Sequence, residues 1–381
     1  MDEVSETTAL IPPDHSDGTR DADPQPVKRI AVKRIITVEP VVFMSITAYI
    51  AMIPLSEQYV YSHYAHIYGI SDTRNSVPEA CDPNATQADH DLQTKVQQKS
   101  SLFMVILNFC VFAGAIPSCI VLGAYSDNAG RKWSMIISLL GGVFRTLTFV
   151  IVTSLDLSMY YLLAGNLVDG IMGSVTGVQM ASFAYIADIT TADNRSFRIL
   201  VLEIAIGIGV MSSNLSVGYL IKAIGFVYPF LFAMILYTLG FLYVIVLLPE
   251  TVYYVPGTKL FDLKHFSTTL QLLTKETPNK RRNKLILNLI LLTSVAMVEI
   301  AMPDVQALRA FNFPLCLNSV LYGYYVAEQY LCKDAGSIVL MKFGLKRIGR
   351  NGLLIIGCVS FIVYNIGYGL AWTPTVLFFG K

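Results

Sequence analysis

Ionisable side chains inside long apolar stretches are the residues of this sequence that could do chemistry. Arg145, Asp169 and Glu203 each lie within a run of apolar residues long enough to cross a bilayer as a helix. A charged group at the centre of such a helix costs about 2.5–3.5 kcal/mol on insertion scales. Groups found there either neutralise one another and hold helices together, or they bind protons and charged substrates.

Arg145 and Asp169 have the spacing of a neutralising pair. Each lies twelve residues into its apolar stretch, which begins at Trp133 for Arg145 and at Leu157 for Asp169. The two helices run in opposite directions, so a rise of about 1.5 Å per residue places both groups near the midplane, about 6 Å apart in depth. We expect mainly pairing, with substrate contact open for Arg145. Glu328, in a later stretch, is a further group of this kind.

Glu203 is surrounded in the sequence by small residues that leave room for a neighbouring helix or a ligand, namely Ala205, Gly207 and Gly209. Burial favours the neutral form of a carboxyl group. The sequence therefore predicts that Glu203 takes up protons, although a structural role is the alternative.

A short charged hairpin separates the apolar runs Leu102–Leu122 and Trp133–Val152. Its glycines permit a tight turn, and its two cations indicate the cytosolic side of a membrane. The hairpin is either an ordinary connection or a gating element. Its defining residues are Gly123, Asp127, Gly130, Arg131 and Lys132.

The composition excludes a soluble globular protein. Of 381 residues, 54% are hydrophobic and 14% are charged, and the mean hydropathy is +0.54. No phosphate loop or paired catalytic constellation is present, so we expect no enzyme activity, and no cysteine spacing typical of a metal site. A net charge of +1 gives no indication of nucleic-acid binding. The expected partners are the lipid bilayer and a small solute.

Nine apolar stretches divide the chain and predict an all-α membrane protein. We expect a disordered cytosolic tail over residues 1–36 and a first six-helix half over 37–248, with an external loop at 60–100. A basic cytosolic linker follows at 249–284, and a partial second half with three helices occupies 285–381.

Signals in the polar segments bear on topology and location. Cations before the first stretch place the amino terminus in the cytosol, so the sequon at Asn84 is external and open to glycosylation. Cys81 and Cys316 also fall in external loops. In the tail, Glu6, Leu10 and Ile11 have the arrangement of an acidic dileucine sorting signal, a short pattern that also arises by chance.

Several short motifs together with the charged hairpin resemble the proton-coupled folate transporter family of the major facilitator superfamily. The resemblance runs from about residue 37 to the end. It implies two six-helix halves, so helices 10–12 of that arrangement are missing from this sequence. The motifs include Val38-Glu39-Pro40, Ser182-Phe183, Ala187-Asp188, Phe197-Arg198, Leu202-Glu203, Pro314-Leu315-Cys316 and Gly323-Tyr324.

The resemblance implies symport of organic anions, folates among them, with protons as the coupling ion and no organic cofactor. It assigns proton coupling to Glu203 and Asp304, and to Glu299, which stands where the family has a titratable histidine. It also implies a disulfide between Cys81 and Cys316. Ser174 replaces an acid of the folate transporter and Asn166 an arginine, which leaves folate itself open as the substrate.

Two alternatives stay open at this stage. The chain could be a truncated, non-transporting membrane isoform that acts as a receptor or as a partner of a longer form. Drug–proton antiporters of the same superfamily are a closer alternative, but they carry a Gly-Pro motif in helix 5, and Gly207–Gly218 contains no proline. The substrate, the direction of transport, the oligomeric state and the choice between plasma membrane and endosomal or lysosomal membrane are left open.

Overall fold

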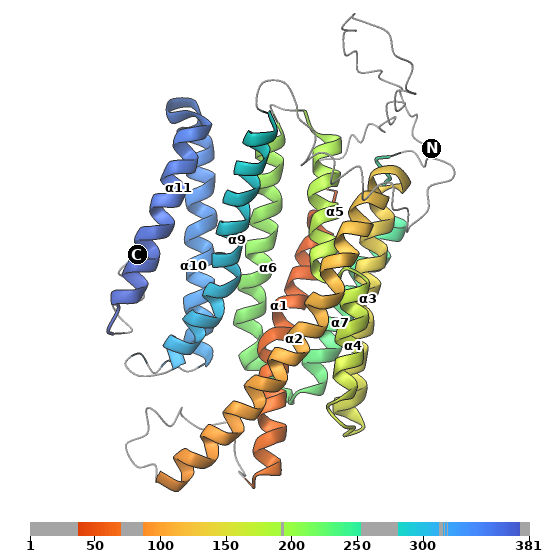
Figure 1. Cartoon of the computed structure of the whole chain (residues 1–381), viewed down its shortest axis with the longest axis vertical. Helices are drawn as coiled ribbons and strands as arrows, with labels where there is room; N and C mark the ends of the chain where they lie inside the picture. The colour runs from red at the N-terminus through yellow and green to blue at the C-terminus, as the bar shows by residue number, and fades with distance from the viewer. Residues whose placement is uncertain are drawn as a thin grey trace, which may run out of the picture.

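The computed structural model describes residues 37–69, 87–191, 194–252, 281–311, 315, 317 and 319–373. Two groups of roughly antiparallel helices lie side by side in these ranges (Figure 1). The first group comprises α1 (Glu39–Ile67), α2 (Gln87–Ala129), α3 (Arg131–Ser154), α4 (Tyr161–Ile171), α5 (Ser174–Ile189), α6 (Arg195–Ile224) and α7 (Val227–Val246). The second comprises α9 (Arg281–Phe311), α10 (Ser319–Val339), the π-helical turn η3 (Leu340–Gly344) and α11 (Leu345–Leu370).

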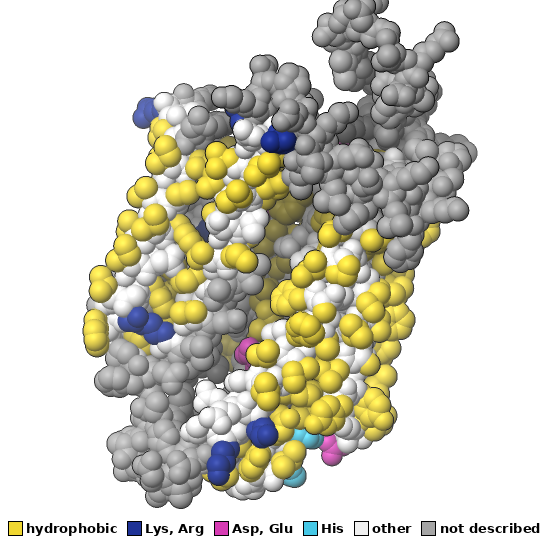
Figure 2. All heavy atoms as spheres, in the orientation of Figure 1, with side chains coloured by type: hydrophobic (Ala, Val, Ile, Leu, Met, Phe, Trp, Pro, Cys, Tyr) yellow, Lys and Arg dark blue, Asp and Glu magenta, His cyan; other side chains and the backbone are white. Residues whose placement is uncertain are grey.

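Six helices in the described ranges are long and apolar enough to cross a membrane. They are α1, α3 and α7 in full, together with residues 94–129 of α2, 195–221 of α6 and 352–370 of α11. Their outward faces are apolar as well (Figure 2). Phe109 of α2 is 69% exposed and Val246 of α7 is 73% exposed. Such a surface is suited to lipid rather than to water.

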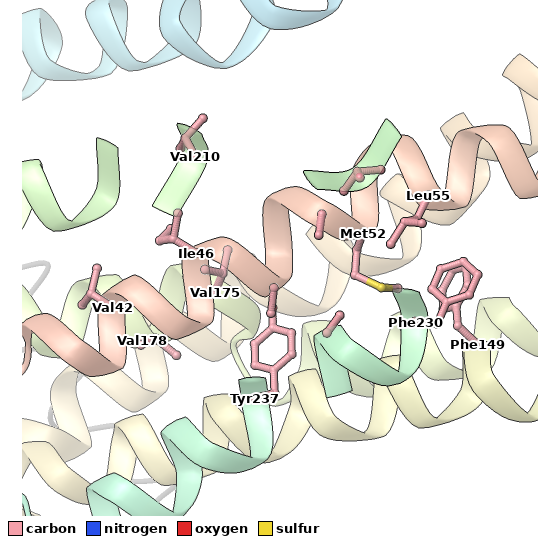
Figure 3. Close-up of a cluster of buried hydrophobic side chains, with 14 of the residues drawn as sticks. Val42, Ile46, Met52, Leu55, Phe149, Val175, Val178, Val210, Phe230 and Tyr237 are labelled. Carbon is pink, nitrogen blue, oxygen red and sulfur yellow. The ribbon is translucent and has the colours of Figure 1, made fainter. Parts of the chain in front are cut away.

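Helix α1 lies at the centre of the first group and packs against α2, α5, α6 and α7. Its Met52 and Leu55 point toward the aromatic rings of Phe149 and Phe230, as Figure 3 shows. All four side chains are essentially inaccessible to solvent. In the most apolar stretch of each helix, 61% of the residues are buried for α1 but 28% for α2 and 33% for α7, so the latter two lie at the periphery.

The apolar stretch that begins at Leu157, one of the nine expected to cross the membrane as a single helix, contains two helices, α4 and α5. Gly173 and Ser174 have positive φ angles of 95° and 49°, which end α4 and start α5 in a new direction. The positive φ of Gly173 favours glycine there, since L side chains rarely adopt that conformation. An uninterrupted apolar run does not reveal such a break.

The helices also extend beyond the expected loop boundaries. The external loop was expected over 60–100, but α1 continues to Ile67 and α2 begins at Gln87. Likewise, α9 begins at Arg281, inside the expected linker 249–284. Hydropathy marks the edge of the hydrocarbon layer, whereas a helix can continue into water because its backbone hydrogen bonds are internal.

The two groups meet along α6 and α10. Gly323 of α10 approaches so closely that an added β-carbon would lie 2.7 Å from the Asn214 carbonyl oxygen of α6. Nearby, the hydroxyl groups of Tyr219 and Tyr324 are 2.7 Å apart. Figure 2 shows the surface hollowed along the boundary between the groups. The packing of α6 against α10 therefore sets the relative position of the two halves.

Candidate functional site

The charged hairpin between α2 and α3 is fastened by Arg131. Its Nε donates a 2.9 Å hydrogen bond to Asp188 at the end of α5. Its Nη1 donates a 2.9 Å bond to Ser126 Oγ and also pairs with Asp127. The side chain of Asp188 is 4% exposed and that of Asp127 is 61% exposed. One guanidinium thus joins α2, α3 and α5, and leaves Asp127 largely open to solvent.

Glu250, just after α7, closes the amino terminus of α3. Its carboxylate accepts hydrogen bonds from the backbone N–H groups of Arg131, at 2.9 Å, and Lys132, at 3.2 Å. A carboxylate is favourable at this end of a helix, where backbone donors lack helical partners. Gly130 has a φ of 115°, and a β-carbon there would lie 2.6 Å from Glu250 Cδ. This contact explains the glycine at that position.

The exit of α7 is held by two further hydrogen bonds. Lys132 Nζ donates to the Ile245 carbonyl at 2.7 Å, and the Tyr185 hydroxyl donates to the Pro249 carbonyl at 3.0 Å. All of these contacts lie within the first half. In this conformation the hairpin therefore ties helices of that half to one another.

Arg145 and Asp169 are brought together in the interior of the first half. Arg145 Nη1 lies 3.7 Å from Asp169 Oδ2, and the two residues are 5% and 0% exposed. Ser174 donates a 2.8 Å hydrogen bond to the same carboxylate oxygen, and the ring of Tyr49 lies 5.5 Å from the guanidinium carbon. Within the described structure, Arg145 Nε and Nη1 and Asp169 Oδ1 have no hydrogen-bond partner. The pair is neutral in sum but retains unused hydrogen-bonding capacity.

A second set of charged groups lies where the two halves meet. Glu203 of α6 is half-buried, and the charges of Glu299, Lys333 and Asp334 act on it. Glu299 comes from α9 and the other two from α10. Asp334 is 8% exposed and packs against Gly207, one turn after Glu203. Glu203 and Asp334 thus lie at the boundary between the halves, whereas Glu299 and Lys333 are exposed groups whose charges act on Glu203.

Glu328 faces a different environment. It acts electrostatically on Tyr364 of α11, whose hydroxyl group bonds to that of Tyr325 and accepts from Gln306 Nε2 at 3.1 Å. Tyr368 donates to the Gln306 carbonyl at 2.8 Å. This polar cluster joins α9, α10 and α11 and lies apart from the Arg145–Asp169 pair.

Several expected sites cannot be placed. Asp304 belongs to α9, but its side chain is outside the described part of the structure. The cysteines Cys110, Cys119, Cys332 and Cys358 are free thiols. The following residues lie outside the described ranges: Glu6, Leu10, Ile11, Cys81, Asn84 and Cys316.

Sequence reasoning missed Glu250 and Gly207 as site residues. Glu250 follows the end of an apolar stretch, where an acid is expected simply because the chain leaves the membrane. Its hydrogen-bond partners lie more than a hundred residues earlier in the sequence. Gly207 was noted only as a small residue that leaves space. A glycine one turn from a membrane carboxyl is the signal that could have indicated an approaching polar group.

Comparison with known proteins identifies the family. The profile of the Major Facilitator Superfamily matches residues 38–380, so the chain belongs to that superfamily of membrane transporters. It is a multi-pass membrane protein and not an enzyme.

Two curated proteins and one solved structure illustrate the relationship. The bovine proton-coupled folate transporter is 29% identical over 89% of this chain and 76% of its own length. The mouse lysosomal proton-coupled steroid conjugate and bile acid symporter SLC46A3 is 28% identical over 76% of this chain and 65% of its own length. The human organic anion transporter MFSD10 (TETRAN) superposes with a TM-score of 0.53 at 17% identity, covering 78% of this chain and 69% of the other. The last comparison supports the fold alone.

Proposed function

We propose that the chain is a secondary active transporter that couples the movement of protons to that of organic anions. The observation that supports the proposal is the pair of acids at the boundary between the halves, Glu203 on α6 and Asp334 on α10, together with Glu299 of α9, whose charge acts on Glu203. Transporters of this superfamily work by moving one half against the other around a site near the midplane. Carboxyl groups contributed by both halves are therefore suited to link proton binding to that movement.

The charge balance at this boundary supports proton binding. The charges that act on Glu203 are those of one lysine ammonium and two further carboxyl groups, and like charges disfavour full ionisation. Uptake of one proton brings the set closer to neutrality. Glu299 replaces the titratable histidine of the family, and a carboxyl group can serve the same purpose at a lower pH.

The substrate class is proposed from the relatives together with Arg145. Both relatives are proton-coupled, and their names give folate, steroid conjugates and bile acids as substrates. These compounds are amphipathic anions. Arg145 supplies a buried guanidinium with unused donors, while Ser174 and Asn166 replace charged residues of the folate transporter. We therefore favour anions that are bulkier and more apolar than folate.

Location and orientation belong to the same proposal. The amino terminus lies in the cytosol, and the protein works in the plasma membrane or in endosomal or lysosomal membranes, where the outer or luminal side is acidic. The acidic dileucine pattern and the lysosomal relative support the second location.

A transport assay tests the proposal. The purified chain is reconstituted into liposomes, and uptake of radiolabelled folate, estrone sulfate and taurocholate is measured at external pH 5.5 and 7.4 against an internal pH of 7.4. Empty liposomes and a protonophore are the controls. We expect acid-stimulated uptake of at least one of the three anions that the protonophore abolishes. Uptake no greater than in empty liposomes for all three would refute the proposed substrate class.

A further inference from the structure

Asp334 is the most unusual charged group at the boundary between the halves. The residue is 8% exposed, and its Oδ2 has no hydrogen-bond partner within the described structure. A β-carbon placed on Gly207 of α6 would lie 2.8 Å from Asp334 Cγ and would overlap Oδ2. The carboxyl group of one half is thus seated directly on the backbone of the other. A carboxylate in such a place is costly unless it is paired or protonated.

Glu203 is the nearest acid on the facing helix. Residues four apart on a helix lie on the same face, so Glu203 and Gly207 both face α10. The charge of Asp334 acts on Glu203 across this contact. One carboxyl group from each half therefore lies at the packing contact of α6 and α10, with Asp334 against Gly207 and Glu203 one turn away on the same face.

The other groups near this contact do not neutralise both acids. Glu299 of α9 adds negative charge, and Lys333 of α10 supplies one positive charge. Lys333 Nζ lies 5.4 Å above the ring of Tyr330. Tyr330 is the remaining titratable group near Glu203 and Asp334. On the neighbouring elements, Arg198 of α6 is engaged by Glu39 of α1 at 2.7 Å, and Lys342 of η3 lies over Phe343.

We infer that Asp334 is a second proton-binding group of the transporter and shares a proton with Glu203 across the α6–α10 contact. The inference rests on the proposed function and assigns it a further residue. With the proton present, one carboxyl group donates to the other and the repulsion between the halves disappears. When the proton leaves, two carboxylates face each other and the contact between α6 and α10 weakens. Proton release thereby frees one half to move against the other.

Crosslinking across the same pair of helices tests this without any substrate. Tyr219 and Tyr324 are 51% and 47% exposed, and their hydroxyl groups are 2.7 Å apart. The double substitution Tyr219→Cys, Tyr324→Cys therefore reports the α6–α10 contact when the thiols are joined by a flexible bifunctional thiol reagent, because touching hydroxyl groups do not bring the β-carbons within disulfide range. A matched control lies within the first half. Thr176→Cys pairs with the native Cys119, whose sulfur lies 3.3 Å from Thr176 Oγ1. The control corrects for the pH dependence of thiol chemistry.

We expect the corrected crosslinking rate to be about fivefold or more higher at pH 5.5 than at pH 7.4, in keeping with usual coupling between sites. Asp334→Asn keeps a hydrogen-bond donor without the charge and should make the rate independent of pH at its higher value. Gly207→Ala keeps both acids but displaces the carboxyl group of Asp334. It should also make the crosslinking rate independent of pH, at the lower of the two rates. If one of the two variants does not fold, the crosslinking rate of the other still tests whether Asp334 and Glu203 share a proton.

Two results separate this inference from the proposed function. If the chain transports anions in response to acid but Asp334→Asn crosslinks with the pH dependence of the parent, the shared proton is refuted and the function stands. If crosslinking depends on pH and on Asp334 but none of the three anions is transported, the proposed substrate class is refuted and the carboxyl pair stands. A parent chain whose corrected rate does not change with pH overturns the inference outright.

Discussion

The guanidinium of Arg198 lies 2.7 Å from the Glu39 carboxylate and joins the start of α6 to the start of α1. The backbone N–H of Thr37 donates to the other carboxylate oxygen at 2.7 Å, and Tyr243 of α7 donates to the Thr37 carbonyl at 3.1 Å. Both charged residues belong to motifs through which the sequence resembles its family. Their role in this structure is to hold three helices at one end of the first half.

Removing one partner of this pair should destabilise the protein. Glu39 is 6% exposed, so Arg198→Met leaves a nearly buried charge unpaired, whereas Glu39→Gln with Arg198→Met removes both charges. We expect the double variant to be more stable than the sum of the two single effects predicts, by about 0.5–3 kcal/mol. The free energies of unfolding of the parent, the two single variants and the double variant are measured in mixed detergent micelles. If the two single effects add up to the double effect, Glu39 and Arg198 do not interact.

Glu203→Gln should remove the acid-stimulated component of transport. The amide has nearly the size of the carboxyl group but cannot release a proton, so uptake should become similar at pH 5.5 and 7.4. Surface biotinylation checks that the variant reaches the membrane. An unchanged pH dependence in a normally expressed variant would contradict a proton-coupling role for Glu203.

The hairpin should affect the rate of transport more than apparent affinity. Asp127 lies at the end of α2 and Arg131 at the start of α3, about 15 Å from the midplane of a core about 30 Å thick, too far for substrate contact at a central site. Asp127→Asn should lower the maximal rate with little change in KM. A loss confined to KM would show that Asp127 contributes to substrate binding instead.

Glu250→Ala should loosen the same hairpin by a different route. The substitution removes two hydrogen bonds to backbone N–H groups at the start of α3. Loss of a helix cap of this kind costs about 0.5–2 kcal/mol. A lower melting temperature in detergent is expected, and Glu250→Gln, which can still accept one hydrogen bond, should fall between the variant and the parent. Equal melting temperatures for all three proteins would refute the cap.

A glycine substitution tests the packing of α2 against α4. A β-carbon at Gly170 would collide with the Val111 carbonyl oxygen, whereas one at Gly357 of α11 would meet nothing within 4 Å. Gly170→Ala should cost about 1–3 kcal/mol through overpacking. Gly357→Ala should be neutral or slightly stabilising, since alanine favours the helix. If both variants have the melting temperature of the parent, close packing of α2 against α4 at Gly170 is contradicted.

Much of the fold and part of the site followed from the sequence. Hydropathy located the apolar helices, and a constant rise per residue brought Arg145 near Asp169, because antiparallel helices in a bilayer share one depth scale. Contacts that depend on packing between distant segments did not follow. Glu250 reaches α3 only because α7 ends beside it, and Asp334 reaches α6 only because Gly207 leaves room for its carboxyl group. The contact of Glu250 leaves no local pattern in the chain, and that of Asp334 leaves only a glycine one turn from Glu203.

The break at Gly173 bears on how the chain enters the membrane during synthesis. With 11 and 16 residues, α4 and α5 are about 16 and 24 Å long, so neither crosses a hydrocarbon layer of about 30 Å alone. The carbonyl groups at the break receive hydrogen bonds from other helices: Met172 from Ser138 of α3 at 3.0 Å, and Gly173 from Cys119 of α2. Both donors precede the break in the chain and are made first. The fourth crossing is therefore stabilised at its break by side chains of two helices that are already made, in addition to the bonds that Gly173 receives from Gly177 and Thr176 of α5.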